Sequence, residues 1–255
     1  MKKSSVQMLA KIIVSILGII LVGWLLYRSP SVREIVVSGA GRMGAPAVGY
    51  LRKVATTDDD IKVRQQAMVA LQDMNADAVP PLLEALGDED AEVRKEAAFV
   101  LCTLGGAQAK QAVPNLIDSL KNDSAPMVRR FAARALGRAR PSAQEAVAAL
   151  LVSLKESEAI VRANSAEALS VICYLAEADA DGIIPALIEA LEDSGGSVRQ
   201  EAAEGLGRIG PRANAALPAL AKALQDPEFE VRTEAKEAIE RIQRNFSPPQ
   251  KMKAN

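Results

Sequence analysis

The chain has 255 residues, of which 49% are hydrophobic and 3% aromatic, and its formal net charge is −1. It contains no histidine, which excludes His-based general-base catalysis, Ser-His-Asp triads and zinc sites that need an imidazole. The near-zero net charge argues against a global basic field that would attract nucleic acid or an acidic membrane surface. Because the apolar residues are mainly Ala, Leu, Val and Ile, the composition favours closely stacked helices over an aromatic-rich β-sandwich.

An uncharged apolar run lies near the N-terminus, at residues 12–27 (IIVSILGIILVGWLLY). Extended back to residue 6, a helix of this length spans about 33 Å, enough to cross a hydrocarbon core of about 30 Å. Trp24 and Tyr27 stand at one end, where amphipathic rings favour the membrane interface. We therefore predict a segment 1–30 that contains one transmembrane signal-anchor helix at about 6–27.

A cleaved signal peptide is the alternative, since Lys2 and Lys3 form a suitable basic start. No A-x-A-like site follows the run closely and Arg28 comes directly after it, which favours an uncleaved anchor. The basic groups before the run slightly outweigh those after it, so we expect a cytoplasmic N-terminus and an extracytoplasmic remainder. The predicted location is single-pass, in a bacterial inner membrane.

A Val-Arg pair recurs through the rest of the chain, at 32–33, 63–64, 93–94, 128–129, 161–162, 198–199 and 231–232. Small or apolar residues follow each Val by four, eight and eleven positions, as Ala132, Leu136 and Ala139 do. This spacing is typical of one face of an α-helix. The regular return of the pair indicates an array of repeated helical units.

A second helical pattern precedes each pair from the third onward, at 79–86, 113–120, 147–154, 183–191 and 217–224. Prolines fall near the start of four of these segments, where a missing N–H costs little: Pro80, Pro114, Pro185 and Pro218. Short acidic turns join the two helices of each unit. Residues 31–246 are therefore predicted to form an all-α solenoid of about six helix pairs, followed by a disordered tail at 247–255.

The pattern V-P-x-L-x-x-x-L…D…x-V-R-x-x-A-A-x-A-L-G resembles HEAT repeats, in particular the short type of phycobilisome-lyase-like proteins. The resemblance covers residues 31–246 and implies a right-handed α-solenoid. It also implies that the turn acid and the helix-opening arginine bridge neighbouring units, which concerns Arg94, Arg129, Arg162, Arg199 and Arg232. The fourth repeat departs from the pattern, since Ser157 and Glu158 stand where an Asp is usual.

Residues 35–44 (IVVSGAGRMG) contain a G-x-G-x-x-G spacing, and acidic residues follow at 58–60. This superficially matches a dinucleotide-binding fingerprint, but no second strand and no parallel sheet follow it. Residues 31–44 also align without gaps on 197–210, where the same glycine spacing falls late in a helix. We therefore predict that 31–44 is the second helix of a degenerate first unit, with nucleotide binding as the minor alternative.

Stacked units create a concave surface lined by their second helices. Positions three, six and ten after each Val are expected to be exposed there. In the membrane-proximal half they give an aromatic and arginine-rich group: Val69, Phe99, Phe131, Arg134 and Arg138. In the distal half they give an acidic group: Glu201, Glu204, Glu234 and Glu237.

An aromatic patch rimmed by arginine resembles a protein-binding hot spot. Our hypothesis is that the first group anchors a partner segment while the acidic group steers a basic one. The alternative is that both Phe rings pack between units and the charges only keep the array soluble. The arginines of 129–140, Arg130 included, could also bind an anion, although one helix without interleaved aromatics is weak evidence.

We predict a non-enzymatic, membrane-anchored scaffold or assembly factor that binds a protein partner on its concave face. Cofactor, metal, small-molecule substrate and nucleic acid are not expected. The resemblance implies an alternative, a phycobilin lyase-like or chaperone-like factor acting on a chromophore-bearing protein. The anchor and the lack of an identifiable catalytic constellation count against that alternative. A third function is a spacer that holds something at a fixed distance from the membrane.

Overall fold

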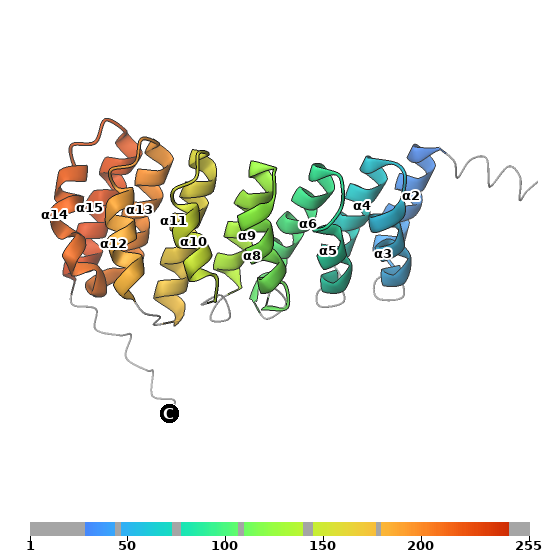
Figure 1. Cartoon of the computed structure of the whole chain (residues 1–255), viewed down its shortest axis with the longest axis horizontal. Coiled ribbons are helices and arrows are strands. Elements are labelled where there is room, and N and C mark those ends of the chain that lie inside the picture. The colour runs from blue at the N-terminus through green and yellow to red at the C-terminus, as the bar shows by residue number, and fades with distance from the viewer. Residues whose placement is uncertain are drawn as a thin grey trace, which may run out of the picture. The chain divides into compact units, whose positions relative to one another are not determined.

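The computed structural model describes residues 29–43, 47–72, 78–106, 110–139, 145–176 and 180–244. All regular secondary structure in these ranges is helical (Figure 1), which confirms the predicted all-α class. The chain divides into two compact units, residues 1–81 and 82–255.

The first unit contains α2 (Pro30–Gly41), α3 (Val48–Thr57) and α4 (Ile61–Gln72). Helix α4 packs against both α2 and α3, and Leu51 and Met68 are fully buried in this unit. Helix α3 was not predicted from the sequence, because its segment lacks the V-P-x-L phrase of the later repeats. Its buried residues Leu51, Val54 and Ala55 nevertheless lie on one helical face.

The second unit alternates first and second helices of the repeats, and α5 (Val79–Ala85) crosses its boundary. The first helices are α8 (Val113–Asn122), α10 (Val147–Ser153), α12 (Ala180–Ala190) and α14 (Leu217–Ala223), the last preceded by the 3-10 segment η4 (Gly210–Ala216). The second helices are α6 (Ala91–Leu104), α9 (Pro126–Arg138), α11 (Ala159–Ala176), α13 (Gly196–Ile209) and α15 (Phe229–Gln243). The predicted helix pairs are confirmed, with one correction: α12 begins before the expected residue 183, so Pro185 lies inside it.

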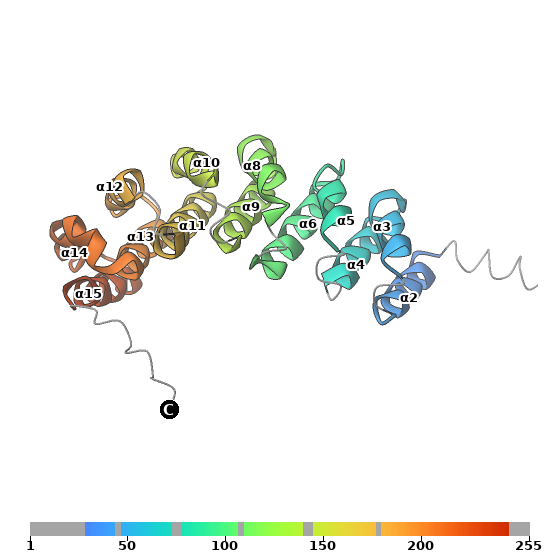
Figure 2. The same ribbon diagram turned by 90° about the horizontal axis from the view of Figure 1, so that it is seen from below.

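Within the second unit the second helices form a continuous inner layer. Each packs extensively against the next second helix, whereas the first helices scarcely touch one another (Figure 2). The layer of first helices is therefore spread more widely than the layer of second helices. This arrangement places the second helices on the inner side of the unit's curve, as expected for stacked helical repeats.

Glycines late in the second helices allow their close approach. A Cβ atom on Gly207 of α13 would lie 2.8 Å from the Cα of Ala238 on α15. In the first unit, a Cβ on Gly41 of α2 would lie 3.0 Å from the Cβ of Ala70 on α4. The glycine-rich motif thus lies in helix α2 as far as residue 41, where it serves helix packing, which confirms the helical prediction for this segment.

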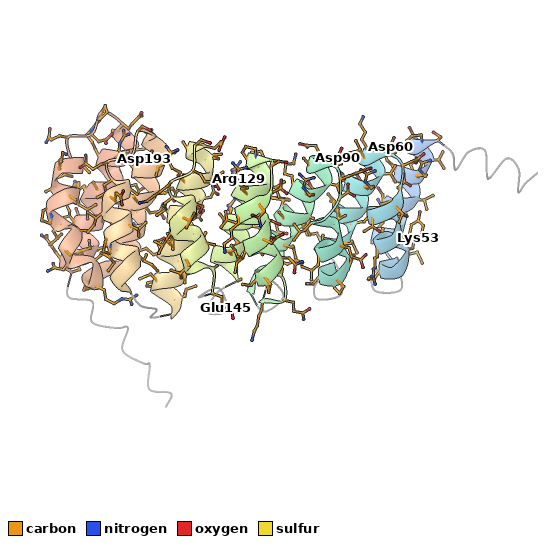
Figure 3. All side chains as sticks on the ribbon, in the orientation of Figure 1. Lys53, Asp60, Asp90, Arg129, Glu145 and Asp193 are labelled. Carbon is orange, nitrogen blue, oxygen red and sulfur yellow. The ribbon has the colours of Figure 1, made fainter. Side chains whose placement is uncertain are left out.

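The arginine of each Val-Arg pair joins one repeat to the next. Arg162 donates from Nε and Nη2 to the carboxylate of Asp193, at 2.7 and 2.6 Å, and from Nη1 to the carbonyl oxygens of residues 156 and 157 in its own turn. Arg94 donates from Nε and Nη2 to Asp123 in the same way, and Arg199 does so to Asp226. Asp90, Arg129 and Asp193 lie along one edge of the second unit, with Glu145 at the opposite edge (Figure 3).

Two repeats vary this arrangement. Arg129 contacts Glu156 at 2.7 Å and Glu158 at 2.9 Å. These two glutamates replace the aspartate that the fourth repeat lacks as the ion-pair partners of the arginine. The bridging role is therefore confirmed for Arg94, Arg129, Arg162 and Arg199. It is wrong for Arg232, which binds only the carbonyl oxygens of Asp226 and Pro227 among the hydrogen-bond acceptors in the described ranges.

The anchor predicted at about 6–27 and the tail predicted at 247–255 lie outside the described residues. In the described part of the chain, no helix combines the length and the apolar character needed to cross a membrane. The described helices run from Pro30 to Gln243.

Candidate partner-binding surface

Eight of the nine predicted site residues lie on the inner layer of the second unit. They are Phe99 on α6, Phe131, Arg134 and Arg138 on α9, Glu201 and Glu204 on α13, and Glu234 and Glu237 on α15. Val69 belongs to the first unit, where it lies on α4 and is 44% exposed. The expected row is not uniformly open, since Asn164 on α11 is buried and donates to the carbonyl oxygen of Ile160.

The two phenylalanines contact each other across the boundary between α6 and α9. Their ring centroids are 5.3 Å apart and the ring planes meet at 71°, an edge-to-face arrangement that aromatic pairs favour. Both side chains are half-buried. Phe99 and Phe131 therefore pack against each other between two repeats, and part of each ring stays exposed at the surface.

Three arginines of α9 lie along the side of the helix next to these rings. Arg130, Arg134 and Arg138 are spaced four residues apart, so they project from the same side. The guanidinium carbon of Arg130 lies 5.1 Å from the ring centroid of Phe131, within the range of a cation–π contact. We call Phe99, Phe131, Arg130, Arg134 and Arg138 the aromatic–arginine patch.

The arginines of the patch have unused hydrogen-bonding capacity. Within the described ranges none of the three forms an ion pair. The Nε atoms of Arg130 and Arg134 are buried and lack an acceptor there. A buried donor without an acceptor is unfavourable, so these guanidinium groups are suited to bind carboxylate or carbonyl oxygens of a partner. Arg130 was missing from the predicted site because its position, two after Val128, is off the expected row.

Cys102 lies on α6, the helix of Phe99, and is 2% exposed. Burial raises the pKa of its thiol, the charges of Arg138 and Arg134 oppose this, and Glu167 adds to the rise. A thiol with a raised pKa stays protonated and is a poor nucleophile.

The acidic group crosses from α11 to α15. Burial raises the pKa of Glu201 to about 7, with further contributions from Glu167, Glu204 and Glu234, while Arg208 lowers it. Glu167 was not in the predicted group, although it stands six positions after Val161 on the expected row. The carboxylates therefore interact across three second helices, and protonation of one relieves the repulsion.

Arginines of the same helices partly neutralise this group. Arg208 pairs with Glu204 one helical turn away and donates to the Ser170 hydroxyl at 2.7 Å. Arg241 Nη2 lies 2.6 Å from an oxygen of Glu237. The acidic group thus carries less net charge than its glutamates alone indicate. In the described ranges, no three acidic or cysteine side chains are placed to hold a metal ion.

The sequence model of HEAT repeats matches residues 22–102, 79–170 and 171–244. The chain belongs to the HEAT-repeat family. No curated protein matches it, but solved structures do. An engineered protein is 28% identical, with a TM-score of 0.57 over 76% of this chain and 96% of that one.

Two further solved structures resemble the chain. A designed armadillo repeat protein in complex with the peptide (KR)4 is 20% identical, with a TM-score of 0.56 over 76% of this chain and 99% of that one. The complex of CpcE and CpcF of phycocyanin lyase from Nostoc sp. gives 25% identity and a TM-score of 0.53, over 63% of this chain and 98% of the matched chain. These likenesses agree with an all-helical repeat solenoid.

Proposed function

We propose that this HEAT-repeat chain is a membrane-tethered scaffold that binds a protein partner on the inner face of its second unit. The aromatic–arginine patch is the observation that carries the proposal. Aromatic and arginine side chains dominate the energetics of protein interfaces, and the patch combines two half-buried rings with three arginines that form no ion pair in the described ranges. Carboxylates of the partner would form charge-assisted hydrogen bonds with these arginines.

The acidic group and the arginines of the patch give the two ends of the proposed surface opposite charges. Arg130, Arg134 and Arg138 lie on α9, whereas Glu201 and Glu234 lie on α13 and α15, with α11 between. A partner segment with an acidic end over α9 and a basic end over α13 would match both groups. The designed armadillo protein, which was solved in complex with the peptide (KR)4, supports the idea that a solenoid of helical repeats can bind a peptide.

The apolar run at residues 12–27 supports the membrane tether of the proposed scaffold. Deleting residues 1–28 should therefore move the protein from the membrane pellet to the soluble fraction of lysed cells. The full chain should stay in the pellet after a carbonate wash, which strips peripheral proteins. Recovery of the full chain in the soluble fraction would contradict the tether without bearing on the patch.

Affinity capture from gently solubilised native membranes tests the binding function. Wild type is compared with the double variant Phe99→Glu, Phe131→Glu and with the control Val152→Glu, whose side chain on α10 is 70% exposed in the layer of first helices. Circular dichroism checks that each variant is folded. A protein retained by wild type and the control but lost from the double variant supports the proposal, whereas a protein retained by all three contradicts it.

A lyase-like or chaperone-like action on a chromophore-bearing protein is the second candidate. The likeness to the CpcE–CpcF complex of phycocyanin lyase, at 25% identity, favours it. Mixing the purified chain with a bilin should then produce a new absorbance band that follows the protein through gel filtration. An unchanged bilin spectrum would count against this function.

A further inference from the structure

Three arginines of the second unit hold the carboxylate of the next repeat in a recurring geometry. The Nε and Nη2 atoms form a fork around one aspartate, and an oxygen of that aspartate also accepts the backbone N–H two residues further on. The N–H donors are Ala125 for Asp123, Gly195 for Asp193 and Glu228 for Asp226, at 2.8, 2.7 and 2.9 Å. We call a turn in which the aspartate accepts this backbone N–H an Asp turn.

Arg232, in the first turn of α15, has half of this geometry. Its Nη1 donates to the carbonyl oxygens of Asp226 and Pro227, at 2.6 and 2.8 Å, as Arg199 does to Asp193 and Ser194. No carboxylate of the described residues faces its Nε and Nη2 atoms. Among the described residues, the fork of Arg232 is thus held in position by the two carbonyl oxygens, without a carboxylate between its Nε and Nη2 donors.

The surroundings of this fork favour an acidic ligand. A recess of about 830 Å³ lies against α14 and α15 and is lined by Leu224, Phe229 and Arg232 among others. Four basic residues line the recess, namely Arg232, Lys236, Arg241 and Arg244, together with two acidic residues, Glu237 and Glu240. Basic side chains therefore outnumber acidic ones in the lining. The two glutamates pair with Arg241 on α15 and with Arg244, the residue that follows α15. Arg232 and Lys236 are therefore the positive charges that face an incoming group.

Phe229 distinguishes this end from every junction inside the unit. Two residues before the Val of each pair, the earlier repeats have small or compact side chains: Ala91, Pro126, Ala159 and Gly196. The next repeat packs over this position, since a Cβ on Gly196 would lie 2.9 Å from Cγ of Glu228. Phe229 stands there instead, 67% exposed and 5.7 Å from the Arg232 guanidinium. Phe229 therefore lies where the residue two positions after the aspartate of an Asp turn packs at the internal junction, as Glu228 does over Gly196.

We propose that the α14–α15 end of the second unit is a docking surface for the Asp turn of a partner protein. The partner's carboxylate enters the Arg232 fork and its apolar side chains surround Phe229. An exposed aromatic ring beside an arginine is the composition of an interface hot spot. This surface is separate from the inner-face patch, so it does not depend on the function proposed above.

Nuclear magnetic resonance of the full chain tests the proposal with a defined probe. The probe is the capped peptide NDSAPM, which copies residues 122–127 and contains the Asp turn that Arg94 holds. The control peptide has asparagine in place of aspartate. The Nε–H resonance of Arg232 should shift saturably with the Asp peptide, whereas that of Arg199, already paired with Asp226, should not.

The Asn peptide should bind roughly tenfold more weakly, because a charge-assisted pair is lost. Phe229→Gly should weaken binding of the Asp peptide several-fold, and the matched control Lys236→Gln, which removes one charge of the same face, should weaken it less. An Arg232 resonance that stays in place, or that shifts equally with both peptides, would overturn the proposal. So would a wild-type dimer in sedimentation that becomes monomeric in Arg232→Gln, since the occupant would then be a second copy of the chain.

Discussion

Arg162 and Asp193 form a two-point ion pair that joins consecutive repeats, with Nε–Oδ2 and Nη2–Oδ1 distances of 2.7 and 2.6 Å. Both side chains are largely buried, at 10% and 14% exposure. Burial raises the pKa of Asp193, but hydrogen bonds from Arg162 and the Gly195 N–H, together with the charges of Arg162 and Arg199, bring that pKa below its usual value. The carboxylate is thus ionised and depends on its arginine.

Arg162→Gln should therefore lower the free energy of unfolding by about 3 kcal/mol, because it leaves a buried carboxylate without its partner. Urea unfolding followed by circular dichroism measures the loss. Arg232→Gln is the matched control: it removes an arginine from the same repeat position but breaks no carboxylate pair, so about 1 kcal/mol is expected. Equal losses in the two variants would show that the bridge adds no stability.

Glu201 should make stability depend on pH between about 4.5 and 7. Its pKa in the folded chain is about 7, above the ordinary 4.5, so the folded state holds its proton more tightly than the unfolded state. Stability is then full below pH 4.5 and falls as pH rises to about 7. Glu201→Gln should raise the free energy of unfolding at pH 8 by about 1–2 kcal/mol, after allowance for solvent screening.

At pH 4, where Glu201 is mainly protonated in both states, the same variant should be close to wild type in thermal unfolding. Glu240→Gln on α15 is the control, since its carboxylate pairs with Arg244 near the surface. A Glu201→Gln gain that is the same at pH 4 and pH 8 would contradict the raised pKa.

The close approach of α13 and α15 depends on Gly207. A Cβ at this position would lie 2.8 Å from the Cα of Ala238, so Gly207→Ala should lower stability by about 1–3 kcal/mol through overpacking. Gly39→Ala in α2 meets nothing within 4 Å and should instead raise stability by about 0.5–1 kcal/mol through helix propensity. Thermal unfolding of both variants measures these changes in stability. A higher stability of Gly207→Ala would contradict the close contact between α13 and α15.

Leu136 and Arg138 lie two residues apart on α9 and differ in burial: Leu136 is fully buried and Arg138 is exposed. Leu136→Ala should cost about 2–5 kcal/mol because it opens a cavity. Arg138→Ala should be near neutral. Two neutral variants would mean that the face of α9 is assigned wrongly.

Much of the fold could be predicted from the sequence because each helix pair carries the same local phrase. The Val-Arg pair fixes the start of each second helix through the bonds of Arg162 and its counterparts to their own turns. Helix α3 escaped prediction because its segment lacks the proline and leucine phrase. The sequence shows that Glu158 stands where an Asp is usual, but the simultaneous contacts of Glu156 and Glu158 with Arg129 depend on how the turn folds.

The candidate surface was less predictable, since periodicity gives the face of a helix and not the contacts upon it. It placed Phe131, Arg134 and Arg138 on one helix correctly. It could not show that Phe99 and Phe131 touch edge to face, or that Arg130 joins them. Periodicity also could not show that arginines partly neutralise the negative charge of the acidic group, because the pairing of Arg208 with Glu204 depends on side-chain conformation.

Site-specific photo-crosslinking tests the inner-face scaffold most directly. Benzoylphenylalanine replaces Phe131 in the full chain in intact cells, with the same residue at Val152 of α10 as the control. We expect one predominant adduct from position 131 that is absent from position 152 and is lost when Arg134 and Arg138 are changed to glutamate. No adduct from position 131, or the same adducts from both positions, would contradict partner binding at the aromatic–arginine patch.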